Sequence, residues 1–166
     1  MIKILLLFML FGSISYIGFE SSKIYKSKEN FFCDLLSFTK SIKTEISFLK
    51  TDILEMINKN KYESKFNDFL IEYKNALKND KSLSKSNITE ILKNIIDLKD
   101  DEIESISQMF FELGNIGYNE QLERLEYYIE TYINFYNQSN ENSKKMMPLC
   151  KKMGILTGIL VCIVLI

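Results

Sequence analysis

The chain has 166 residues, 46% of them hydrophobic, and its 21 Lys and Arg against 22 Asp and Glu leave a net charge of −1. This balance disfavours nucleic acid as a partner, and the absence of histidine removes the commonest general base and the usual zinc ligand. One proline, six glycines and no tryptophan are typical of an all-α protein. One domain with apolar ends is expected.

Residues 1–20 read MIKILLLFMLFGSISYIGFE and carry no charge between Ile4 and Phe19. The small-x-small pattern of a signal peptidase site is missing, because Tyr16 and Ile17 are bulky. As a helix, the uncharged part would cover about 24 Å of a hydrocarbon layer about 30 Å thick. We therefore predict a retained transmembrane anchor over residues 1–20, with a cleaved signal peptide as the alternative.

Residues 149–166 form a second apolar segment, which ends MGILTGILVCIVLI. Its Ile, Leu and Val side chains together favour membrane insertion by roughly 4 kcal/mol. Its uncharged end would span only about 21 Å, so it would be a short membrane segment. A buried core helix is the alternative.

Lysines lie next to both apolar segments, on the side of the middle region. Positive residues beside a membrane segment favour the cytoplasmic side. We predict that residues 21–148 form a cytoplasmic helical bundle and that both chain ends point across the membrane. The flanking lysines are Lys23, Lys26 and Lys28 after the first segment, and Lys144, Lys145, Lys151 and Lys152 around the start of the second.

The first helix of the middle region is predicted over residues 31–57, continuous with the anchor. Its apolar residues recur at steps of three and four, which is typical of one buried helical face. A second helix is expected over residues 66–77, followed by a loop over residues 78–87. The predicted inward residues of the first helix are Leu35, Phe38, Ile42, Ile46, Leu49, Ile53 and Met56, and those of the second are Phe66, Phe69, Leu70, Tyr73 and Leu77.

Capping residues predict where three further helices begin. Asn87 and Glu90 resemble a capping box, Asp100 is placed to cap the next helix, and Asn119 is placed to cap the last. Gly114 is expected to end the helix that begins near Asp100. The last helix should bury Leu122, Leu125, Ile129, Tyr132, Ile133 and Tyr136, and Pro148 should kink the chain before the apolar end. The expected fold is all-α, an antiparallel bundle of about five or six helices flanked by the two membrane segments.

The sequence has no clear motif for catalysis, metal binding or disulfide formation. Three cysteines, Cys33, Cys150 and Cys162, lie beside or within apolar segments and define neither a disulfide framework nor a metal motif. The acidic run DLKDDEIESISQ lacks the glycine and the closing glutamate of a calcium loop. The aromatic residues sit at helical spacing and are interpreted as core. We predict no enzyme, no catalytic residue, no cofactor, no metal site and no small-molecule substrate, a hydrolase being the disfavoured alternative.

An acidic surface is the strongest candidate for a partner contact. Between residues 97 and 130 there are ten acidic residues against two basic ones, Lys99 and Arg124. Glu123, Glu126 and Glu130 share a helical face opposite the apolar stripe, so they could meet a basic partner. A solvated face is the alternative reading. Glu20, where the anchor ends, is a second candidate contact.

Four stretches of the sequence resemble, in order and spacing, the stage III sporulation protein AB family of spore-forming bacteria. They are GFESSKIY at residues 18–25, KTEISF at residues 43–48, FELGNIGYNEQ at residues 111–121 and KKMGILTGILVCIVLI at residues 151–166. The most specific parts are Gly18, Phe19 and Glu20 at the anchor exit and Leu113 and Gly114 in an interhelical turn. The chain departs from the family at Gly117, where an acid is usual, and in LKTDIL, where a Pro-Leu is usual.

The resemblance implies a membrane role. The family is similar to the cytoplasmic domain of the F protein of type II secretion systems, an inner-membrane platform. A member would belong to the stage III A channel complex around the forespore, in the mother-cell membrane, with a secretion-type ATPase and other membrane proteins as partners. We expect a scaffold that couples the ATPase to channel assembly. The rival is a secreted or surface-anchored helical binding module with a cleaved signal peptide.

Overall fold

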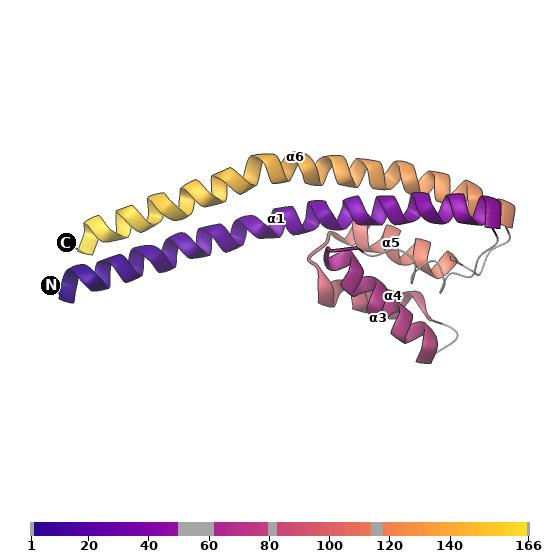
Figure 1. The fold of residues 1–166 in the computed structure, drawn as a ribbon, viewed down its shortest axis with the longest axis horizontal. Helices are drawn as coiled ribbons and strands as arrows, with labels where there is room; N and C mark the ends of the chain where they lie inside the picture. Colours follow the sequence, from indigo (N-terminus) through magenta and orange to yellow (C-terminus); the bar gives the residue numbers. More distant parts are fainter. Residues whose placement is uncertain (1, 50–61, 80–82, 114–117, 166) are drawn as a thin grey trace. The chain divides into compact units, whose positions relative to one another are not determined.

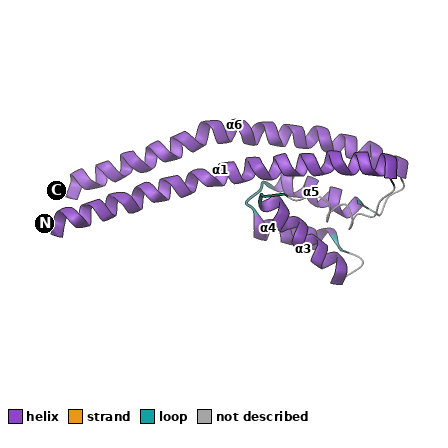
Figure 2. Ribbon diagram, in the orientation of Figure 1, coloured by secondary structure: helices purple, strands orange, loops and turns teal. Residues whose placement is uncertain are grey.

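The computed structural model describes residues 2–49, 62–79, 83–113 and 118–165, with side chains for residues 7–46, 62–78, 83–113 and 120–165. All of the regular structure in these ranges is helical, and they contain no strand (Figure 2). The all-α prediction is therefore confirmed for this part of the chain. The helices are α1 (Ile2–Leu49), α3 (Lys65–Asn79), α4 (Lys85–Ile95), α5 (Asp100–Glu112) and α6 (Tyr118–Leu165).

The chain divides into two compact units. The first combines residues 1–29 with residues 138–166, so it holds the beginning of α1 and the end of α6. These two helical segments lie side by side and antiparallel, and we call them the hairpin (Figure 1). The second unit, residues 30–137, holds the rest of both long helices together with α3, α4 and α5, and we call it the bundle.

The hydrophobic core of the bundle includes the face of α1 that the residue spacing predicts. Leu35, Phe38, Ile42 and Ile46 are all buried. The remaining predicted positions, from Leu49 to the expected helix end at residue 57, lie outside the described side chains. A single helix therefore joins the predicted anchor to the predicted first bundle helix, as expected.

Aromatic rings form the centre of this core. Phe110 of α5 stacks on Phe38 of α1 at 5.7 Å between ring centroids and meets the edge of Phe69 of α3 at 4.8 Å. Phe66 and Tyr73 of α3 also pack against Phe110. Aromatic pairs of this kind add about 0.5–1.5 kcal/mol each beyond the area that they bury. The interpretation of the aromatic residues as core is confirmed for this cluster.

All three predicted helix starts are wrong by one to three residues. Helix α4 begins at Lys85 because Ser84 is its N-cap and accepts a hydrogen bond from the Asn87 backbone N–H at 3.4 Å. Asn87 therefore lies inside the first turn. Ser84 is as good a capping residue as asparagine, and the earlier start adds a turn while keeping Ile88 on the buried face.

Helix α5 is capped at Lys99, so Asp100 is its first residue instead of its cap. The carboxylate of Glu102 accepts a hydrogen bond from the Lys99 backbone N–H at 2.7 Å. This reach back over three residues is the reciprocal half of a capping box, and it places the cap at Lys99. The helix ends at Glu112 with Leu113 as its C-cap, and Gly114 lies outside the described residues.

Helix α6 begins at Tyr118, so Asn119 is a helical residue and the predicted cap is wrong. Leu125 and Tyr132 are buried as predicted, and Tyr128, which was not predicted, is buried with them. Leu122, Ile129, Ile133 and Tyr136 are half-buried. Pro148 lies within α6, which continues to Leu165, so this proline does not end the helix.

Candidate interaction surfaces of the hairpin and the bundle

Two glycines bring the helices of the hairpin into backbone contact. A Cβ atom added to Gly18 of α1 would lie 2.8 Å from the Cα of Gly154 in α6, and one added to Gly154 would lie 2.9 Å from the Cα of Gly18. Real Cβ atoms do not approach other atoms this closely. Small residues that allow such an approach are characteristic of helix pairs in membranes, where packing replaces the hydrophobic effect.

Further small residues extend this contact along the hairpin. A Cβ at Gly158 would lie 2.8 Å from the ring of Phe11 and 3.4 Å from the hydroxyl of Ser15. Near the chain ends, the thiol of Cys162 donates to the backbone carbonyl of Leu7 at 3.7 Å. The close packing of the two helices was not predicted from the sequence. Gly154 and Gly158 nevertheless form a G-x-x-x-G pattern, which is the sequence signal for such packing.

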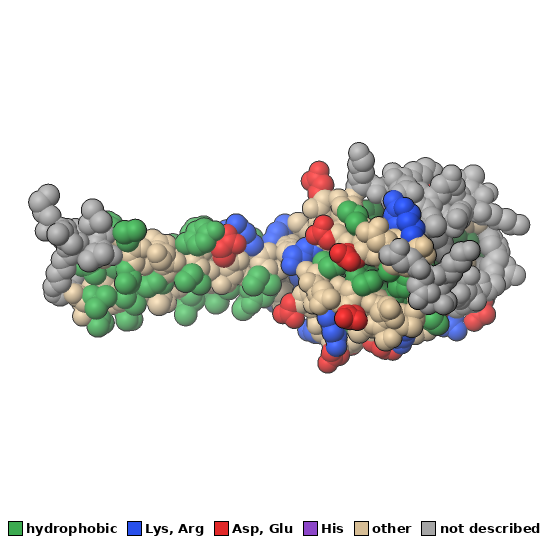
Figure 3. All heavy atoms as spheres, turned by 90° about the horizontal axis from the view of Figure 1, so that it is seen from below, with side chains coloured by type: hydrophobic (Ala, Val, Ile, Leu, Met, Phe, Trp, Pro, Cys, Tyr) green, Lys and Arg blue, Asp and Glu red, His purple; other side chains and the backbone are tan. Residues whose placement is uncertain are grey.

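The outer surface of the hairpin is apolar. Phe8 is 73% exposed and Val164 is 75% exposed, and large exposed side chains recur along both helices. Figure 3 shows mainly hydrophobic side chains on the visible face of this unit, at left. The others with exposures above 45% are Met9, Tyr16, Ile17 and Ile24 of α1 and Leu149, Met153, Leu156, Leu160, Ile163 and Leu165 of α6.

In the part of the chain that the structure describes, one helix is long and apolar enough to cross a membrane. It is α6, within residues 120–165, and 11% of its most apolar window is buried. A helix in the core of a soluble protein would bury most of such a window. The low burial is what a membrane segment requires.

Gly18, Phe19 and Glu20 lie where the apolar part of the hairpin meets its lysines. Gly18 contacts α6, and the ring of Phe19 lies under the ammonium group of Lys151, which is 5.5 Å from the ring centroid. Glu20, the predicted partner contact, forms an ion pair with Lys23 at 2.5 Å, and its side chain is 43% exposed. The three residues thus have three different contacts at one level of the hairpin.

Glu29 occupies a polar position in the same unit. Burial raises the pKa of this carboxyl, but hydrogen bonds from Lys26 and Ser143 and the charges of Lys26 and Lys144 outweigh burial. The pKa of Glu29 therefore lies below its usual value. The ion pair between Lys26 and Glu29 measures 2.7 Å, and it links residues three apart on one helix face.

The predicted acidic face of α6 is exposed in the bundle. Glu123, Glu126 and Glu130 are all on the surface, and the neighbouring Tyr127 is 66% exposed. Glu126 forms an ion pair with Lys43 of α1, so its charge is partly compensated within the bundle. Glu123 and Glu130 have no ion pair among the described residues, which makes them the stronger contact candidates.

Glu112, an acidic residue at the end of α5, has a structural role that the sequence did not suggest. The carboxylate of Glu112, at the end of α5, accepts hydrogen bonds from Arg124 at 2.7 Å, Tyr128 at 2.9 Å and Gln108 at 2.6 Å. Glu112 is buried, and so is the adjacent Leu113. This polar cluster ties the end of α5 to α6.

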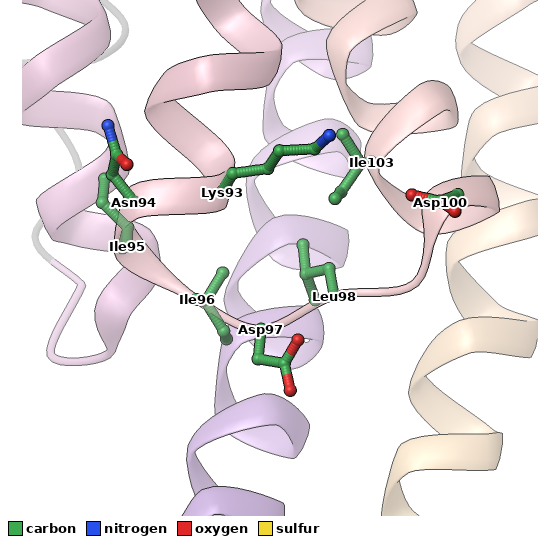
Figure 4. Close-up of a pocket in the computed structure, with 8 residues that line it drawn as sticks. All are labelled: Lys93, Asn94, Ile95, Ile96, Asp97, Leu98, Asp100 and Ile103. Atoms are coloured by element: carbon green, nitrogen blue, oxygen red, sulfur yellow. The ribbon is translucent and has the colours of Figure 1, made fainter.

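A hollow lies at the link between α4 and α5 of the bundle (Figure 4). It measures about 360 Å³, and Lys93 extends toward Ile103 along it. Its acidic residues are Asp97 and Asp100. Among the described residues, no group of three or more His, Cys, Asp or Glu side chains is arranged to hold a metal ion. We assign no reaction to this hollow.

Comparison with known protein families identifies the family of this chain. A family model described as stage III sporulation protein AB matches residues 3–166. The chain belongs to this family. No curated protein and no solved structure matches it. The resemblance read from the sequence is therefore confirmed, and membership of the stage III sporulation protein AB family makes the chain a sporulation protein.

Proposed function

We propose that the protein is a non-enzymatic membrane platform component of the stage III A channel complex. In this role residues 1–20 and 149–166, the apolar part of the hairpin, sit in the mother-cell membrane that surrounds the forespore, and residues 21–148 face the mother-cell cytoplasm. The bundle binds the secretion-type ATPase of the complex and couples it to channel assembly, a role suggested by the similarity of the family to the F protein, an inner-membrane platform of type II secretion. The partners are the other stage III A proteins and membrane lipid.

One observation carries this proposal: the same two helices build an apolar hairpin and a folded bundle. Helix α1 contributes residues 2–29 to the hairpin and residues 30–49 to the bundle, and α6 contributes residues 138–165 and 118–137. Both helices pass between the units without a break. A load on the bundle would therefore reach the membrane segments through helical backbone.

The contact between Gly18 and Gly154 supports a retained amino-terminal segment. Cleavage near residue 20 would remove Phe11, Ser15 and Gly18 and expose the side of α6 that now packs against them. The secreted binding module, which requires this cleavage, would give up the close packing of the hairpin. The packing thus favours the anchor over the signal peptide.

The topology is tested by thiol labelling in intact and permeabilised sporulating cells. Cys33 is exposed on the bundle and serves as the native reporter once Cys150 and Cys162 are replaced by alanine. A second variant moves the single thiol to Lys93→Cys, which is exposed on α4. We expect labelling of both only after permeabilisation, together with an uncleaved intact mass.

Labelling in intact cells, or a mass that lacks the first 20 or so residues, would reject the platform and support the secreted module. A hydrolase would require turnover that survives purification and is lost on a point mutation. The proposed platform needs no catalytic residue, no cofactor and no substrate.

The partner face is tested by reversing its charge. The double variant Glu123→Lys with Glu130→Lys should weaken binding of the ATPase to the full-length protein while the helical signal in circular dichroism stays unchanged. The matched control, Glu72→Lys with Glu90→Lys, makes the same charge change at exposed positions of α3 and α4. Equal binding by the two double variants would reject this face as the contact.

A further inference from the structure

The hairpin has a basic groove on its surface, at the end where the lysines lie. The groove measures about 430 Å³, and it is formed by α1 and α6 together. Its lining includes Lys26 and Glu29 of α1 and Ser143, Lys144, Met147 and Lys151 of α6. The groove therefore belongs to one unit and does not depend on the bundle.

The charges of the groove are unbalanced. Three lysines face one acid, so the lining has a net charge of +2. Glu29 already has a partner, since its carboxylate is 2.7 Å from the ammonium group of Lys26. Among the described residues Lys144 and Lys151 form no ion pair, although the charge of Lys144 also acts on Glu29. Two ammonium groups beside a hollow of this size are suited to the oxygens of a phosphate.

Apolar residues continue the groove along the hairpin. At helical steps of three and four, the face that carries Lys144 and Lys151 goes on to Ile155 and Ile159, which are 39% and 45% exposed. Phe19 lies beside this path because its ring contacts Lys151. A basic hollow that opens onto an exposed apolar stripe fits a ligand with a charged head and hydrocarbon chains.

We propose that this groove binds the headgroup of an anionic phospholipid. Lys144 and Lys151 contact the phosphate, Glu29 holds Lys26 at the rim, and the acyl chains lie along Phe19, Ile155 and Ile159. A free phosphate ion would use the lysines and leave the apolar stripe uncovered, so the lipid fits the whole feature. This inference rests on the membrane placement in the proposed function.

The test uses the full-length protein in phosphatidylcholine vesicles with a trace of spin-labelled lipid. Electron paramagnetic resonance compares the immobilised fraction of labelled phosphatidylglycerol with that of labelled phosphatidylcholine carrying the same chains. We expect the wild-type protein to prefer phosphatidylglycerol by about five-fold or more, as one or two lysines near a phosphate would give. Lys144→Gln with Lys151→Gln should reduce the preference to less than about two-fold.

The control is Lys145→Gln with Lys152→Gln, which removes the same charge from neighbouring lysines outside the groove. It should keep the wild-type preference. Equal losses in both double variants would mean that general surface charge attracts the lipid, and the groove would be rejected. Loss of the wild-type preference on adding inorganic phosphate would mean that the site takes the free ion, which also overturns the proposal.

Flotation with pure phosphatidylcholine vesicles separates this inference from the proposed function. A protein that floats with the vesicles but shows no lipid preference refutes the groove alone. A protein that does not float refutes the membrane placement, and the lipid site with it. Circular dichroism of each variant shows whether its helices are intact.

Discussion

Replacing Gly18 by leucine should open the hairpin, and the structure gives the size of the effect. The added Cβ would lie 2.8 Å from the Cα of Gly154 and 3.0 Å from the carbonyl oxygen of Cys150. Carbon atoms in contact prefer about 3.5–4.0 Å, so the helices would have to separate by roughly 1 Å at this level. Both neighbours are backbone atoms and cannot rotate away.

Overpacking of this kind costs about 1–3 kcal/mol. A loss of about 2 kcal/mol would raise the population of the open hairpin roughly 30-fold. Gly12 provides the matched control, because a Cβ there meets nothing within 4 Å. Gly12→Leu changes the same residue types on the same helix and should leave the hairpin closed.

The assay measures how fast a buried thiol reacts with N-ethylmaleimide in the detergent-solubilised, full-length protein. Ser15 is the reporter position, since its hydroxyl is buried and has no hydrogen-bond partner among the described residues. Ser15→Cys is introduced after Cys33, Cys150 and Cys162 have been replaced by alanine. Reaction then requires opening of the hairpin, so its rate follows the open population.

We expect Gly18→Leu to speed the reaction by about ten-fold or more and Gly12→Leu to change it by less than about two-fold. Intact mass spectrometry follows the reaction. The reasoning is refuted if the two variants react at the same rate. Such a result would mean that the close approach of the two glycines does not hold the hairpin together.

Three further predictions concern the bundle and are measured by denaturant unfolding of the full-length protein. Ser84→Ala should lower the free energy of unfolding by about 1 kcal/mol because it removes the cap of α4, whereas Asn87→Ala should have a smaller effect; the reverse order would contradict the observed cap. Glu112→Gln should cost about 1–2 kcal/mol, since its partners lose a charged acceptor, and an unchanged midpoint would show that the buried cluster contributes nothing. Burial raises the pKa of Tyr73 to about 12 from 10.0, so the stability from its neutral form is complete below pH 10 and is lost as the pH rises to about 12. Tyr73→Phe should flatten the pH dependence in that window, and an unchanged slope would contradict this.

Much of the helical content follows from the sequence. The spacing of Leu35, Phe38 and Ile42 identifies the buried face of α1, because a helix repeats every 3.6 residues whatever it packs against. The same local rule predicts Phe66, Phe69 and Tyr73 on one face of α3. Composition also predicts the apolar ends.

Helix starts were less predictable, because several capping residues compete within a few positions. Ser84 and Asn87 can both accept a hydrogen bond from a first-turn amide, and in the structure Ser84 is the cap while Ile88 and Leu92 are buried. Asp100 loses the cap position because Glu102 reaches back to the Lys99 amide. The competing residues at these sites have a similar local preference for the cap position. Packing and the reach of neighbouring side chains therefore determined which residue became the cap.

What the sequence by itself determined is the set of residues on each face of a helix, since that periodicity is a property of one segment. Only the tertiary structure decided which faces meet. The contact between Gly18 and Gly154 joins residues far apart in the chain, and the burial of Glu112 depends on Arg124 and Tyr128 from another helix. An acid looks solvent-exposed in a sequence because its partners are invisible there. Its burial becomes favourable only when another helix brings the hydrogen-bond donors to it.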